Sequence, residues 1–134
     1  MSRLLIIGGM AAALTIAASA SAQNERHWNY PGWRTIAYKT VSGRDTDTIY
    51  SPGRIYQRAV RLCAINAPIH LIDFDVRFAN GGHQDVSTRA LIQGGTCTRA
   101  VDLKGGRRDI SLIRLRYQPV ARNARRPLIR VQVR

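Results

Sequence analysis

Apolar and polar residues alternate along most of the chain from Trp33 onward, most clearly over 60–64, 74–79, 111–117 and 129–133. A period of two places one row of side chains in a core and the other in water, which is typical of antiparallel sheets. Beyond the first residues, no stretch shows the period of an amphipathic helix of useful length. The row expected to face the core is Val60, Leu62, Ala64, Phe74, Val76, Phe78, Ser111, Ile113, Leu115, Tyr117, Ile129, Val131 and Val133.

Turns that contain glycine separate these stretches. Pro52-Gly53 comes first, and three glycine pairs follow at 81–82, 94–95 and 105–106. Glycine adopts the positive φ angles of tight turns without the steric cost that other residues incur. The pairs are 13 and 11 residues apart, an interval typical of short strands in a β-sandwich or barrel. We therefore predict an all-β fold, an antiparallel, jelly-roll-like β-sandwich of about seven or eight strands over 33–134.

The stretch VDLKGGRRDI at 101–110 combines two glycines with two arginines and a lysine. A phosphate loop of the Walker type requires G-x-x-x-x-G-K-[ST] followed by a helix. That motif is absent, and the alternation over 110–117 predicts a strand instead of a helix. We therefore predict a hairpin turn, with a small anion-binding nest of backbone amides as the less favoured alternative.

The first 22 residues follow the plan of a secretory signal peptide. Arg3 supplies the positive charge, Leu4–Ala18 the apolar segment, and Ala20-Ser21-Ala22 an A-x-A cleavage site. A transmembrane anchor is disfavoured because the apolar run has 15 residues, fewer than the roughly 20 that span a bilayer. Cleavage is predicted after Ala22, with Ala20 as the second choice. The predicted organisation is a signal peptide over 1–22, an N-terminal segment over 23–32 and the sandwich over 33–134. Such a protein is exported, to the periplasm or as a secreted protein, and has no membrane span after cleavage.

Two cysteines, Cys63 and Cys97, remain in the predicted mature chain. In an oxidising compartment one disulfide between them is expected, and it would close a loop with 33 residues between its ends. Two free buried thiols are the alternative, which the spacing leaves open. A zinc site is disfavoured because neither cysteine has a Cys or His within four residues.

Five spaced fragments share the pattern of a known group of proteins. The fragments are Trp33 to Ala37, DTDTI at 45–49, RAVRL at 58–62, IDFDVRFANG at 72–81 and VDLKGGRRDISLIRLRY at 101–117. Together they resemble small exported bacterial proteins that are defined only as a domain of unknown function. The resemblance implies a compact β-sandwich and no established catalytic residue. The chain departs from the pattern at 35–37, where a Leu-Gly pair is commoner, and in the arginine-rich tail after Pro119.

Residues with catalytic or metal-binding chemistry are few. His27, His70 and His83 are scattered without a metal-binding spacing, and no G-x-S-x-G motif occurs. Nothing in the spacing favours Cys–His catalysis by Cys63 or Cys97. We therefore predict no catalytic residue, no metal site and no cofactor.

Two pairs of aspartates are the remaining candidates. Asp45 and Asp47 lie near a strand start, where paired carboxylates can bind Ca²⁺. Asp73 and Asp75 share one face of a strand, about 6.8 Å apart, a separation that suits a metal or a glycosidase pair. Arginines adjoin both pairs in the sequence, so structural ion pairing is the favoured interpretation of each.

The chain is strongly basic, with 21 basic and 8 acidic residues and a net charge of +13. Nineteen of the basic residues are arginines, whose planar guanidinium suits phosphate and carboxylate. GC-rich coding would explain the arginine-to-lysine ratio, but it explains the shortage of acids less well. Such a surface attracts anionic lipid headgroups, acidic glycans and nucleic acid alike. Nucleic acid is disfavoured because the few aromatic residues lie mainly at predicted core positions, not on exposed stacking platforms.

The last two strands are predicted to carry an arginine face, provided that they pair with each other. Alternation directs their arginines outward, and two more arginines lie at the preceding turn. The predicted anion-binding residues are Arg107, Arg108, Arg114, Arg116, Arg130 and Arg134. Like charges across paired strands are destabilising unless neutralised, so this face is expected to bind polyanions in a salt-dependent way. Solvated arginines without a ligand are the alternative.

These observations predict an exported, non-catalytic binding or interaction module. Its expected partners are anionic lipid headgroups, acidic glycans or an envelope protein. One alternative is an envelope enzyme that uses Asp73 and Asp75, and another is a Ca²⁺- or carbohydrate-binding sandwich that uses Asp45 and Asp47. A cleft lined by Asp73 and Asp75 would favour the enzyme, whereas carboxylates paired with arginines on an open face would not.

Overall fold

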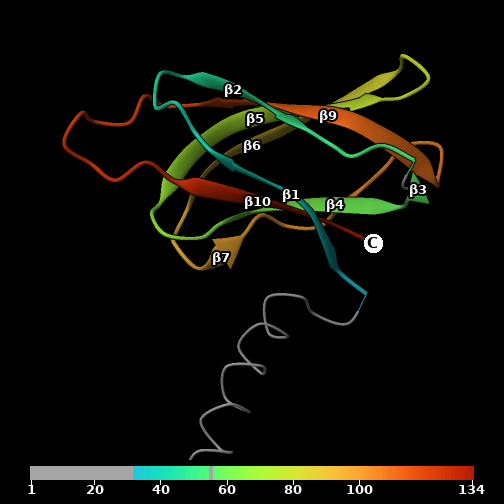
Figure 1. Cartoon of the computed structure of the whole chain (residues 1–134), viewed down its shortest axis with the longest axis horizontal. Coiled ribbons are helices and arrows are strands. Elements are labelled where there is room, and N and C mark those ends of the chain that lie inside the picture. The colour runs from blue at the N-terminus through green and yellow to red at the C-terminus, as the bar shows by residue number, and fades with distance from the viewer. Residues whose placement is uncertain (1–31, 55) are drawn as a thin grey trace, which may run out of the picture. The chain divides into compact units, whose positions relative to one another are not determined.

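The structure is a computed structural model and describes residues 32–54 and 56–134. These residues form ten β-strands (Figure 1). The strands are β1 (Arg34–Thr40), β2 (Thr46–Tyr50), β3 (Tyr56–Gln57), β4 (Ala59–Ala64), β5 (Ile69–Phe78), β6 (His83–Ile92), β7 (Thr96–Cys97), β8 (Val101–Asp102), β9 (Arg108–Tyr117) and β10 (Leu128–Val133). No helix occurs among these residues, and hence none long and apolar enough to cross a membrane. The predicted signal peptide over 1–22 and all but the last residue of the segment 23–32 lie outside the described residues.

The strands form two antiparallel sheets. The first has the order β1-β10-β4-β7, with β8 paired to β4, and the second has the order β2-β9-β5-β6, with β3 paired to β9. Figure 1 shows the two sheets as separate layers. The predicted all-β antiparallel sandwich is confirmed. Its strands number ten rather than seven or eight, because β3, β7 and β8 have only two residues each and carry too little alternation to be recognised.

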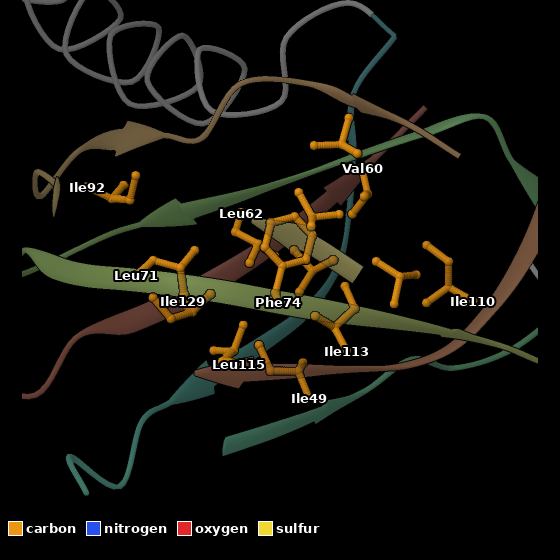
Figure 2. Packing of buried hydrophobic residues seen from close by; sticks show 14 of the residues in the cluster. Ile49, Val60, Leu62, Leu71, Phe74, Ile92, Ile110, Ile113, Leu115 and Ile129 are labelled. Atoms are coloured by element: carbon orange, nitrogen blue, oxygen red, sulfur yellow. The ribbon is translucent and has the colours of Figure 1, made fainter. Parts of the chain in front are cut away.

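The core lies between the two sheets, where the apolar rows of their strands meet (Figure 2). Phe74 and Tyr117 are its largest fully buried side chains, and Leu115 and Val133 are equally inaccessible. Burial of this kind contributes about 25 cal/mol per Å² of apolar surface, so the alternating rows are the main source of stability. All predicted core residues are buried in this cluster except Ser111.

Ser111 leaves the core row because β9 carries a bulge. Arg77 pairs with Leu112 and Phe78 pairs with Ile110, so Ser111 has no partner on β5. An extra residue in one strand reverses the alternation beyond it. Ile110, which is 1 % exposed, therefore takes the core position, and the Ser111 hydroxyl donates to the Arg77 carbonyl.

The last two strands do not pair, so the condition for a shared arginine face is not met. β9 lies between β2 and β5 in the second sheet, whereas β10 lies between β1 and β4 in the first. The connection over 118–127 crosses from one sheet to the other, which strand alternation alone does not reveal. The arginines of β9 and those of β10 therefore point outward from opposite layers of the sandwich, and they do not form one face.

The stretch at 101–110 is a turn, but it does not form the predicted hairpin. β8 pairs with β4 in the first sheet, while β9 belongs to the second, so the turn connects the two sheets. Gly105 and Gly106 both have positive φ angles, as the sequence predicts for a tight turn.

Candidate functional site

Asp73 and Asp75 lie on the outer face of β5, where basic side chains already bind them. Arg116 stands opposite Asp73 on β9, and its Nη2 is 2.5 Å from Oδ2 of that carboxylate. Arg77 Nε lies 2.5 Å from Oδ2 of Asp75, and His83 Nδ1 lies 2.9 Å from Oδ1. These carboxylates are paired with arginines on an open sheet face, which is the arrangement that disfavours the enzyme hypothesis.

The pKa of Asp75 lies below its ordinary value of 3.8. Partial burial alone would raise this pKa, but the hydrogen bonds and charges of Arg77 and His83 outweigh it. A carboxyl whose pKa is lower in the folded state stabilises the fold at pH values above its unfolded-state pKa. That contribution is lost as the pH falls through the lowered folded-state pKa.

We expect Asp75→Asn to lower the free energy of unfolding at pH 7 by about 0.5–1 kcal/mol, since both partners are largely exposed and solvent screens the pair. The variant should also lose less stability than the wild type between pH 5 and pH 2, because it lacks the group that titrates there. Urea unfolding across this pH range measures both effects. Asp102→Asn, which changes an exposed aspartate, is the matched control, and identical pH profiles for the wild type and Asp75→Asn would contradict the assignment.

The second aspartate pair is split between two environments. Asp47 lies on the core-facing side of β2 and accepts hydrogen bonds from the Ser42 backbone N–H (2.9 Å), the Ser42 hydroxyl (3.1 Å) and the Tyr117 hydroxyl. Asp45 precedes the strand, is exposed, and accepts a hydrogen bond from Thr46. One carboxylate is thus part of an internal network and the other is at the surface. In residues 32–54 and 56–134 no three His, Cys, Asp or Glu side chains gather closely enough to hold a metal.

The six predicted anion-binding arginines fall into three groups. Arg114 and Arg116 lie on the outer face of the second sheet. Arg130 and Arg134 belong to the outer face of the first, where their guanidinium groups stack on Tyr38 and Trp33 at 5.2 and 4.6 Å from the ring centres. Arg107 and Arg108 lie together at the end of the sandwich where β9 begins.

Two glycine turns hold the guanidinium of Arg108 in place. It stacks 3.8 Å from the centre of the Phe78 ring and donates to the Asn80 side chain (3.1 Å) and to the Lys104 carbonyl (2.8 Å). A Cβ atom at Gly82 would lie 3.2 Å from Nη2 of this group, and one at Gly105 would lie 3.1 Å from Nη1. The two glycine pairs therefore do more than turn the chain, because their missing side chains leave room for this guanidinium.

A hollow of about 280 Å³ opens beside Arg108, at the end of the second sheet where β3 pairs with β9. We call it the Arg107–Arg108 hollow. Its lining includes Tyr56, Phe78, Asn80, Arg107, Arg108 and Asp109. The sequence identified its two arginines but not Tyr56, Asn80 or Phe78. Tyr56 lies in a two-residue strand, Asn80 in a turn and Phe78 in the core row, so only the fold brings them together.

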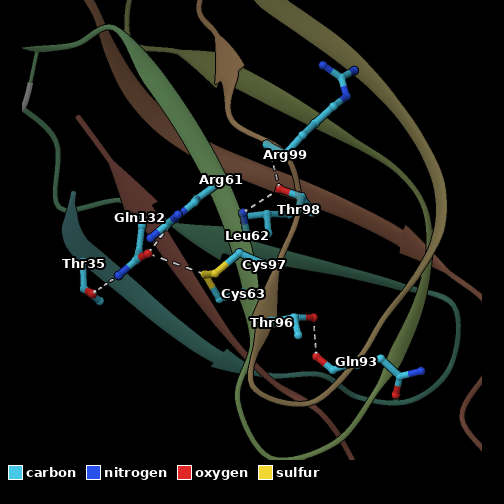
Figure 3. The surroundings of a disulfide bond; sticks show 10 residues. All are labelled: Thr35, Arg61, Leu62, Cys63, Gln93, Thr96, Cys97, Thr98, Arg99 and Gln132. Atoms are coloured by element: carbon cyan, nitrogen blue, oxygen red, sulfur yellow. Dashed lines mark hydrogen bonds between the residues drawn. A yellow bond between two sulfur atoms is a disulfide. The ribbon is translucent and has the colours of Figure 1, made fainter. Parts of the chain in front are cut away.

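The disulfide lies on the other sheet (Figure 3). Cys63 of β4 stands directly opposite Cys97 of β7, and the two are bonded, as predicted. Cys63 is fully buried on the outer side of its strand, where its sulfur lies 3.5 Å from the side-chain oxygen of Gln132. That oxygen accepts a hydrogen bond from Arg61 (2.8 Å). The guanidinium of Arg61 in turn stacks on Trp33, 4.4 Å from the ring centre. Around the disulfide, this face therefore carries polar and aromatic side chains that contact one another.

Comparison with known proteins identifies the family. No curated protein matches the chain. Among solved structures, the crystal structure of protein NMB1881 from Neisseria meningitidis is similar over 76% of this chain and 84% of its own, with 15% identity and a TM-score of 0.24. A family model described as a domain of unknown function, DUF2541, matches residues 9–132. The chain therefore belongs to the DUF2541 family, in agreement with the resemblance of its spaced fragments.

Proposed function

We propose that this protein is an exported, non-catalytic module that binds anionic components of the cell envelope through the Arg107–Arg108 hollow and the basic residues around it. The observation that carries this proposal is the hollow itself, in which two arginines line one concavity. Arg107 is exposed and forms no ion pair within the described residues. Lys104 and Arg54 are both exposed and adjoin the hollow. The backbone carbonyl of Lys104 accepts a hydrogen bond from Arg108, and the backbone N–H of Arg54 donates one to Asp109.

The flat faces of the sandwich offer less to an anion. On the second sheet, Arg116 is occupied by Asp73 and Arg77 by Asp75. On the first sheet, Arg61 and Arg134 stack on Trp33. A ligand that binds Arg116, Arg77 or Arg134 would have to displace an existing partner. At the hollow, by contrast, an exposed arginine stands beside one that is already oriented.

Export is supported by the composition of the first 22 residues and by the disulfide. An A-x-A site after an apolar segment is typical of secreted proteins, and disulfides persist in oxidising compartments. The strand order supports the jelly-roll description, because most connections between successive strands cross from one sheet to the other. A fold of this kind hosts many functions, so the proposal depends on the hollow and not on the fold.

A pair of variants with equal charge tests the proposal. Lys104→Ser/Arg107→Ser removes two exposed charges next to the hollow, and Arg122→Ser/Arg125→Ser removes two exposed charges from the connection over 118–127. We expect the first variant to bind about three- to tenfold more weakly than the second to a polygalacturonate matrix or to vesicles containing phosphatidylglycerol. The difference should shrink as salt is raised, because ions screen exposed charges. Equal retention of the two variants at every salt concentration would show that only net charge matters and would contradict the proposal.

A further inference from the structure

We infer that the Arg107–Arg108 hollow is a site for one acidic sugar, meaning a hydroxylated ring that carries a single carboxylate or phosphate. The inference rests on the proposed anion binding and names the class of ligand. Three features of the hollow carry it: its volume, the state of its arginines, and the aromatic and polar groups on its other walls.

The volume admits a small ligand. Pockets for drug-sized molecules occupy about 300–1,000 Å³, and this hollow has about 280 Å³. One sugar ring with its charged substituent matches that space. A polymer can place a single unit in the hollow, while its neighbouring units stay outside.

The two arginines specify an anionic group on the ligand. Arg108 donates hydrogen bonds to Asn80 and to Lys104, which leaves other N–H groups among its five available to a ligand. The stack on Phe78 fixes the plane of its guanidinium, so the remaining donors are oriented before a ligand arrives. Arg107, exposed and adjacent in sequence, supplies the second positive charge. Arginine forks match the oxygen atoms of carboxylate and phosphate groups.

The other walls specify a hydroxylated ring. Tyr56 lines the hollow and is 60% exposed, so it offers an aromatic ring that other residues leave uncovered. The side-chain nitrogen of Asn80 makes no hydrogen bond to the described residues and can donate to a hydroxyl. Asp109, which also lines the hollow, accepts the backbone N–H of Arg54. Its negative charge repels a second anionic group on the ligand.

This combination separates an acidic sugar from simpler anions. Inorganic phosphate would use the arginines but gain nothing from Tyr56. A neutral sugar would use Tyr56 and Asn80 but leave the arginines without an anion. Only a ligand with both parts uses all the walls, and Asp109 would repel a ligand that carries a second anionic group.

Titration of the disulfide-bonded, isotope-labelled protein with four probes tests the inference by NMR. The probes are glucuronate, glucose 6-phosphate, glucose and inorganic phosphate, all at low salt. We expect glucuronate or glucose 6-phosphate to bind at least about tenfold more tightly than glucose, since a charge-assisted hydrogen bond is worth about 1.5–3 kcal/mol. They should bind about three- to tenfold more tightly than inorganic phosphate, which has no ring to place on Tyr56. The amide signals of Tyr56, Asn80 and Arg107 should shift, and those of β2 should not.

Two variants, each with a matched control, test which residues of the hollow contact the ring and which contact the anionic group. Tyr56→Ser should weaken the acidic sugar about three- to tenfold and leave phosphate unchanged, whereas Tyr50→Ser, which alters a tyrosine that is 72% exposed on β2, should change neither. Arg107→Ser should weaken both anions, and Arg122→Ser should weaken neither. Equal binding of phosphate and the acidic sugars would overturn the inference and leave the proposed anion binding intact. Absence of binding by all four probes, with retention on polyanions still dependent on Lys104 and Arg107, would also overturn the inference alone.

Discussion

Replacing Cys63 and Cys97 together with alanine is expected to lower the free energy of unfolding by roughly 3–4 kcal/mol. The disulfide closes a loop between residues 34 positions apart, and in the chain-entropy model a loop of this length restricts the unfolded state by about that amount. The disulfide also attaches β7 to the sheet, and this strand has only two residues and pairs with β4 alone. Most small domains are stable by about 5–15 kcal/mol, so this loss is a large share.

Urea unfolding of the wild type and of Cys63→Ala/Cys97→Ala measures the effect. Reductant provides the control, since it should destabilise the wild type and leave the double variant unchanged. Two thiols that can be alkylated in the native, unreduced protein would contradict the disulfide. Equal unfolding midpoints would contradict its energetic role.

Tyr117→Phe is expected to lower the free energy of unfolding by about 1–3 kcal/mol, because the variant loses a hydrogen bond to the charged Asp47 and an acceptor for the Gly43 N–H. The Tyr117 ring is fully buried, and its hydroxyl donates to Asp47 and accepts the Gly43 backbone N–H at 3.0 Å. Phenylalanine fills the same space but removes these bonds and the 3.3 Å contact with the Ser42 hydroxyl. The Asp47 carboxylate then loses a donor that holds the turn before β2 against the end of β9.

The same substitution should change the stability of the protein in alkali. Burial, and then the hydrogen bond to Asp47, raise the pKa of Tyr117 above its ordinary value of 10.0. Above pH 10 the unfolded chain therefore loses a proton that the folded chain keeps, and stability falls as the pH rises. Tyr117→Phe should weaken this dependence between pH 9.5 and 11. Tyr50→Phe, at an exposed tyrosine, should leave it intact, and equal slopes for all three proteins would contradict the role of Tyr117.

The fold class followed from alternation because burial of one sheet face imposes a period of two on each strand. The rows containing Phe74 and Ile129 needed no tertiary knowledge to be assigned inward. Ser111 was misplaced because a bulge shifts the phase of alternation, and a single extra residue leaves no local trace in the sequence. The strands β3, β7 and β8 were missed because two residues are too few to show a period.

The sequence also identified Arg107 and Arg108, since a paired glycine turn beside two arginines stands out in any strand protein. It did not reveal the hollow, whose other walls come from residues about 30 and 50 positions earlier in the chain. The aspartates illustrate the same limit. Ion pairing of Asp73 and Asp75 was anticipated from nearby arginines, but the partner of Asp73 is Arg116, 43 residues away.

The sequence by itself determined the properties that depend on near neighbours along the chain. These are the strand character, the inward and outward rows, the turns at glycine pairs and the basic charge, because backbone geometry and side-chain solvation act locally. The tertiary structure alone decided which strands pair. Placing β9 and β10 in different sheets divided the predicted arginine face, and pairing β3 with β9 brought Tyr56 to Arg107 and Arg108. Pairing depends on contacts between distant segments, which only the packed core selects.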